Sequence, residues 1–104
     1  MIELTRKQIL EGKYEYPKGY ITIKPTNHYL ERLEERGIGL ACVPWTVKVT
    51  KDNIYSGKTW DGKNLTSVVI KLKFSRWEDV FICLNPFDCG GKSIWFKEKR
   101  SRLT

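Results

Sequence analysis

The stretch TNHYLERLEERGI, residues 26–38, decides the fold, because the hydrophobic pattern of the chain changes after it. Thr26 or Asn27 is a suitable N-cap, and Gly37 suits the left-handed position after a last turn, so these residues predict a short helix with both ends defined. Beyond Gly39 the hydrophobic period changes from helical to alternating. The pattern predicts helices first and a run of strands afterwards.

Capping residues and turn residues place the remaining elements. Thr5 and Gln8 form a capping box that predicts a second helix near the N-terminus, with Leu4 and Ile9 as its hydrophobic staple. Alternating apolar residues predict strands at residues 20–24, 45–50, 54–60, 65–74, 79–84 and 93–96. The expected fold class is α+β, with one mainly antiparallel sheet of four or five strands and two N-terminal helices packed on one face.

The length of 104 residues predicts a single domain. We expect an N-terminal helix and linker at 1–19, a core at 20–96 and a frayed basic tail at 97–104. No apolar run approaches the ~20 residues of a membrane span, and three cysteines without a close pair argue against a disulfide framework. The sequence therefore predicts a cytoplasmic protein with no membrane partner. No Cys or His spacing indicates a metal site, and no cofactor is expected.

The net charge indicates an anionic partner. Nineteen Lys and Arg against twelve Asp and Glu give +7, which favours nucleic acid first and an acidic protein second. On the sheet face away from the helices we expect a basic surface of Lys48, Lys71 and Lys73. Trp77, beside Arg76 in a turn, is the tryptophan expected to be exposed and able to stack on a base.

The only histidine, His28, lies in the first turn of the predicted helix, with Arg32 one turn below it. Cleavage of RNA by its own 2′-OH needs an acid, a base and cationic stabilisation of the phosphate, but no metal. His28 suits the acid or base role, Arg32 suits the phosphate, and Arg36, Lys71 and Lys73 add positive charge. A solvated polar helix face is the competing interpretation of the same spacing.

The motif His28-x-x-x-Arg32-x-x-x-Arg36-Gly37-Ile38 resembles a family of small uncharacterised bacterial and phage domains. These domains are usually placed beside the barnase, EndoU, colicin and RelE group of metal-independent RNases, many of which are toxins. The similarity extends over about residues 20–84. It implies that His28 and Arg32 occupy the functional positions of the family.

Three functions follow as expectations. The first is a small metal-independent endoribonuclease of toxin type, with RNA as its substrate and a neutralising antitoxin as its partner. The second is a non-catalytic basic protein, for example one encoded by a phage, that binds nucleic acid or an acidic host protein. The third is a structural subunit that forms a defined oligomer and has no affinity for nucleic acid.

Overall fold

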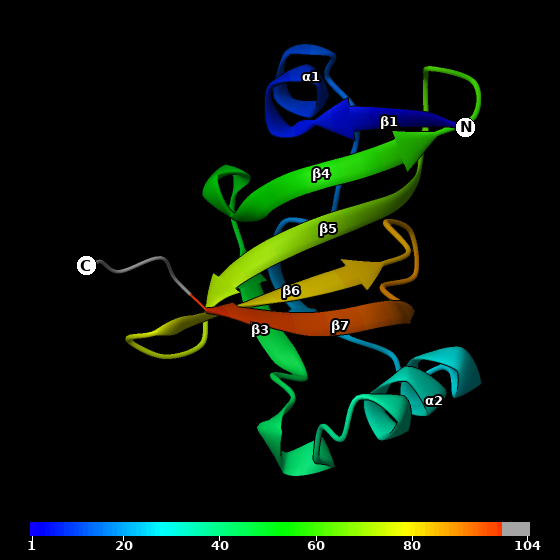
Figure 1. Cartoon of the computed structure of the whole chain (residues 1–104). Coiled ribbons are helices and arrows are strands. Elements are labelled where there is room, and N and C mark those ends of the chain that lie inside the picture. The colour runs from blue at the N-terminus through cyan, green and yellow to red at the C-terminus, as the bar shows by residue number, and fades with distance from the viewer. Residues whose placement is uncertain (99–104) are drawn as a thin grey trace.

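A computed structural model describes residues 1–98 (Figure 1). Its main body is a five-stranded antiparallel sheet in the order β1-β4-β5-β6-β7. The strands are β1 (Ile2–Thr5), β4 (Ile54–Thr59), β5 (Leu65–Lys73), β6 (Glu78–Leu84) and β7 (Gly91–Glu98). Because each consecutive pair from β4 to β7 is joined by a turn, the sheet is a meander to which β1 adds one edge.

Two helices and a second, smaller sheet complete the fold. The helices are α1 (Arg6–Glu11) and α2 (Asn27–Glu35), and the small sheet pairs β2 (Gly19–Thr22) with β3 (Thr46–Val49). Two 3₁₀ turns, η1 (Leu40–Cys42) and η2 (Lys51–Asn53), flank β3. This architecture confirms the α+β class with a five-stranded antiparallel sheet. The sequence pattern did not reveal the second sheet, in which β2 and β3 pair with each other.

The fifth strand of the main sheet is β1, which the sequence pattern missed. We expected Leu4 only as the staple of a helix, yet it pairs with Gly57 in β4 and is buried. The capping box itself is confirmed, since the Thr5 hydroxyl accepts from the Gln8 amide and the Gln8 side chain accepts from the Thr5 amide. A four-residue strand directly before a strong helix start is too short for its alternation to be recognised.

Helix α2 begins and ends where the sequence predicts. Thr26 is its N-cap. At the other end, the Ile38 amide donates to the Leu33 carbonyl at 2.9 Å and the Gly37 amide donates to the Glu34 carbonyl at 3.1 Å. Gly37 has a φ of +64°, which only glycine adopts without strain. This pair of bonds is the Schellman motif.

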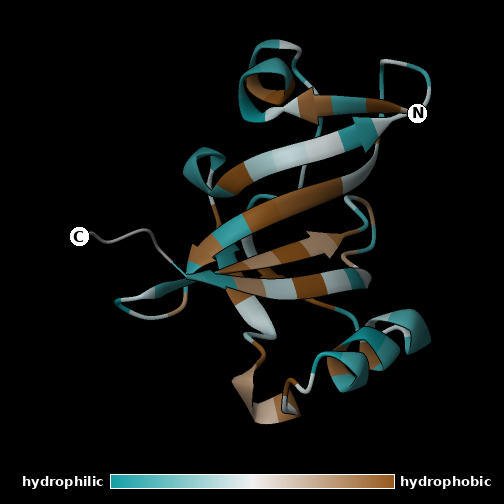
Figure 2. Ribbon diagram, viewed as in Figure 1, coloured by the Kyte–Doolittle hydropathy of each residue, from teal (hydrophilic) through white to brown (hydrophobic). Residues whose placement is uncertain are grey.

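Alternation along the strands gives the main sheet two different faces. The face that packs into the core, here called the inner face, is almost wholly aliphatic and includes Leu4, Ile54, Val68, Ile70, Val80, Ile82, Leu84 and Ile94. Residues of α1, α2 and the small sheet complete this core, among them Ile9, Tyr29, Leu33, Val47 and Val49. Figure 2 shows α2 as mostly hydrophilic with a few hydrophobic positions, as expected for a helix that buries one side.

Both helices therefore lie on the inner face, but at opposite edges of the sheet (Figure 1). None of the helices within residues 1–98 is long and apolar enough to span a membrane. Of the predicted basic tail, Lys97 and Glu98 belong to β7, and residues 99–104 lie outside the described residues.

Candidate nucleic-acid interface

The second face of the main sheet, here called the outer face, is left open to solvent because both helices and the small sheet pack on the inner face (Figure 1). Strand register places four lysines and two acidic residues on it: Lys58, Lys71, Lys73, Lys97, Glu3 and Asp79. The outer face is thus polar and predominantly basic, while the inner face is apolar.

Three aromatic side chains lie together on this face, and we call them the aromatic platform. The rings of Phe81 and Trp95 are stacked, with centroids 5.6 Å apart and planes within 3°. Tyr55 meets Phe81 edge to face at 4.9 Å, and the Lys71 ammonium lies 6.0 Å from the Tyr55 ring. Phe81 is buried between these neighbours, whereas Tyr55 is 46% exposed. The arrangement holds two accessible aromatic rings beside a cation.

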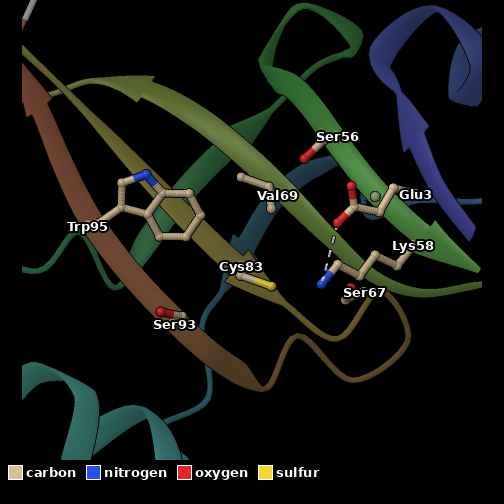
Figure 3. Close-up of a pocket in the computed structure, with 9 residues that line it drawn as sticks. Glu3, Ser56, Lys58, Ser67, Val69, Cys83, Ser93 and Trp95 are labelled. Atoms are coloured by element: carbon tan, nitrogen blue, oxygen red, sulfur yellow. Dashed lines mark ion pairs between the residues drawn. The ribbon is translucent and has the colours of Figure 1, made fainter. Parts of the chain in front are cut away.

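A hollow of about 340 Å³ lies next to the platform (Figure 3). Its lining comes from all five strands and comprises Glu3, Ser56, Gly57, Lys58, Ser67, Val69, Cys83, Ser93 and Trp95. Figure 3 shows the indole of Trp95 extending over the sheet toward Cys83 and Val69, with Glu3 and Lys58 on the far side. The volume lies at the lower end of the ~300–1,000 Å³ range of small-molecule sites.

The rim of the hollow is charged and its floor is neutral. The Lys58 ammonium lies 3.9 Å from the Glu3 carboxylate, and both side chains are largely exposed. Burial raises the pKa of the Cys83 thiol, and Lys92, a hydrogen bond from Ser67 and Lys58 offset this rise only in part. Cys83 is therefore a neutral thiol near pH 7, which suits a packing surface better than a nucleophile.

Arg36 connects α2 to the rim of the hollow. Its guanidinium donates to the Ser93 hydroxyl at 2.9 Å and also to the Ile94 carbonyl on the free edge of β7. The sequence predicted a nucleic-acid contact for this arginine. In the structure its guanidinium binds the free edge of β7, and its contact with nucleic acid stays a prediction.

His28 and Arg32, the predicted catalytic pair, both lie on α2. His28 is exposed in the first turn of α2, and none of the hydrogen bonds or ion pairs within residues 1–98 involves its side chain. The Arg32 guanidinium pairs instead with Glu35, 3.0 Å away on the same helix. The catalytic roles of His28 and Arg32 stay predictions.

The other predicted contacts divide between two surfaces. Lys71 and Lys73 lie on the outer face, and the turn after β5 places Arg76 5.4 Å from the ring of Trp77, which is 58% exposed as expected. Lys48 lies elsewhere, on the solvent side of β3 and 5.7 Å from Tyr20. The prediction that Lys48 shares a face with Lys71 and Lys73 is wrong, because β3 belongs to the small sheet.

The sequence pattern did not reveal the hollow. Alternation along β5 puts Ser67 on the same face as Lys71. It does not show which residues of the neighbouring strands lie beside Ser67. Register shifts between Lys58 and Thr59 and between Cys83 and Leu84 further obscure which residues meet. The only sequence signal for a polar site was that alternate residues of β5, on one face of the strand, include a hydroxyl and lysines.

Among residues 1–98, no group of three or more His, Cys, Asp or Glu side chains is placed to hold a metal ion. Comparison of the chain with protein-family models, curated proteins and solved structures gives no match. The resemblance to the RNase-related family therefore stays an expectation, and a proposal of function depends on the geometry of the outer face.

Proposed function

We propose that this protein binds single-stranded RNA along the outer face of its five-stranded sheet. The observation that supports the proposal is the aromatic platform of Tyr55, Phe81 and Trp95 on an uncovered face that also presents lysines. Aromatic rings on a basic sheet surface suit an unpaired strand, because its bases are free to stack and its phosphates lie within reach of ammonium groups.

Each part of the face has a distinct task in this proposal. The rings of Trp95 and Tyr55 stack on bases, and Phe81 packs against both rings and holds them in place. Lys71 and Lys73 bind phosphates along one end of the face. Duplex RNA binds less well, since its bases are paired and stacked and cannot reach the rings.

The test is the salt dependence of binding to a fluorescent uridine oligomer of about 12 nucleotides, a length within the range that one such domain binds. We expect the affinity to fall as salt rises, with a log–log slope of about −0.7 for each phosphate neutralised. The double variant Lys71→Gln/Lys73→Gln reduces the magnitude of that slope by about 1.4.

A matched control removes the same charge elsewhere. Lys18 and Lys48 are exposed and lie beside Tyr16 and Tyr20 at the small sheet. The double variant Lys18→Gln/Lys48→Gln should keep the wild-type slope. Equal losses in both double variants would mean that net charge alone governs binding and would overturn the assignment to the outer face. Absence of binding to RNA would turn the search to an acidic protein partner.

A metal-independent endoribonuclease of toxin type is the second candidate, since His28 is exposed at the start of α2 and Arg36, at the end of that helix, donates to Ser93 in the lining of the hollow. Its test is incubation of total RNA with the protein in excess EDTA. This candidate predicts fragments that end in 2′,3′-cyclic phosphate for the wild type and none for His28→Ala. If the RNA stays intact with both proteins, the endoribonuclease candidate is overturned and binding without catalysis stands. If fragments persist with His28→Ala, His28 is not the catalytic acid or base.

A further inference from the structure

We infer that the hollow beside the aromatic platform is a subsite for one unpaired guanine base. This inference rests on the proposed binding of RNA to the outer face, and it adds the base that the face prefers. Three features of the hollow bear on it: its width, its neutral floor and the pair of opposite charges on its rim.

The width of the hollow suits one base. Trp95 is on β7, and Lys58 is on β4, three strands away. At ~4.8 Å for each strand spacing, the two backbones are about 14 Å apart. The Trp95 indole extends over the sheet toward Cys83 and Val69 (Figure 3), which narrows this span from the side of β7.

The floor is formed by Val69 and by the neutral thiol of Cys83. An apolar floor and an aromatic wall favour the faces of a heterocycle and offer no partner for a phosphate. A base that lies on this floor against Trp95 directs its hydrogen-bonding edge toward the opposite rim, where Glu3 and Lys58 stand.

The charged rim selects among the four bases. Glu3 offers two acceptor oxygens, and Lys58, 3.9 Å away, offers donors only. Guanine presents two adjacent N–H groups beside the O6 acceptor, so the carboxylate accepts twice while the ammonium donates to O6. Adenine, cytosine and uracil each present a single N–H or amino donor position on that edge and leave one carboxylate oxygen without a partner.

The experiment compares uridine oligomers that contain one central guanine, adenine or cytosine with the all-uridine oligomer. We expect the wild type to bind the guanine oligomer about tenfold more tightly than the others, as one well-paired base edge allows. The variant Glu3→Gln has one acceptor fewer, so it should bind the guanine oligomer no more tightly than it binds the all-uridine oligomer. Glu34→Gln, an equivalent change at an exposed position of α2, should keep the gain.

The outcomes separate the subsite from the proposed function. If the wild type binds all four oligomers equally, the guanine subsite is overturned and RNA binding stands. If it binds none of them, RNA binding is overturned. The subsite is then tested alone, by adding guanosine 5′-monophosphate and following the indole N–H signal of Trp95 by NMR. The signal is assigned by its loss in Trp95→Phe. No shift of this signal would overturn the subsite as well.

Discussion

The two faces of the five-stranded sheet are built by alternate residues of the same strands, yet they differ in nearly every physical property. On β6, Ile82 faces inward and is fully buried, whereas its neighbours Phe81 and Cys83 face outward. The inner face is closed by α1, α2 and the small sheet. The outer face is left open and displays lysines, hydroxyls and aromatic rings.

This difference shows which residues are needed for the stability of the fold and which are not. Aliphatic side chains on the inner face are buried on folding and drive it, at roughly 25 cal/mol per Å². Lys71 and Lys73 add nothing comparable, because their ammonium groups stay in water. A face whose composition folding does not demand is the natural place to look for function.

The largest expected effect comes from adjacent residues of β6 that belong to opposite faces. Ile82→Ala should lower the free energy of unfolding by about 2–5 kcal/mol, because it leaves a cavity in the closed inner face. Cys83→Ala should cost less than half of that, since Cys83 is only partly buried beside the hollow. Urea denaturation of both variants measures the difference. Equal losses would mean that the two faces contribute alike to stability.

The next effect tests how tightly the inner face is closed. A Cβ atom on Gly91 would lie 2.5 Å from Cγ of the fully buried Tyr29, so Gly91→Ala forces β7 and α2 apart. We expect a loss of about 1–3 kcal/mol in urea denaturation. Gly39→Ala is the control, because a Cβ there meets no atom within 4 Å. A neutral Gly91→Ala would show that α2 moves freely on the sheet.

Much of this fold can be predicted from local patterns. The caps of α2 and the capping box at Thr5 follow from short motifs, and turn residues separate the strands. The Asp61 turn is of the same kind, since backbone amides of Lys63 and Asn64 donate to its carboxylate and lower its pKa to about 2. Each of these features depends on residues within one turn of each other.

The assignment of strands to sheets and the site itself depend on distant residues. Lys48 and Lys71 lie on strands with similar alternation, yet β3 joins the small sheet and β5 the main one. Glu3 meets Lys58 only because β1 pairs with β4. No local pattern contains such pairings, so the sequence predicted a basic surface with Lys71 and Lys73 but not the contributions of Lys58, Lys97 and Glu3.

The smallest expected effect concerns a polar atom of α2 that is buried against the inner face. Within residues 1–98 the buried hydroxyl of Tyr29 has no hydrogen-bond partner, and burial raises the pKa of this tyrosine. Tyr29→Phe should therefore stabilise the fold by about 1 kcal/mol near neutral pH, because an unpaired hydroxyl no longer has to be desolvated. The exposed Tyr20→Phe should change nothing.

The pH dependence sharpens the same prediction. The pKa of Tyr29 is higher in the folded chain than its value of about 10 in an unfolded one. Above pH 10 the unfolded chain therefore loses this proton while the folded chain keeps it, so the free energy of unfolding falls as pH rises further. The free energy of unfolding, measured by urea denaturation at several pH values above 10, should therefore fall less steeply with pH for Tyr29→Phe than for the wild type. A Tyr29→Phe variant that is less stable at every pH would mean that the hydroxyl has a partner, and that the inner face holds a polar contact as the outer face does.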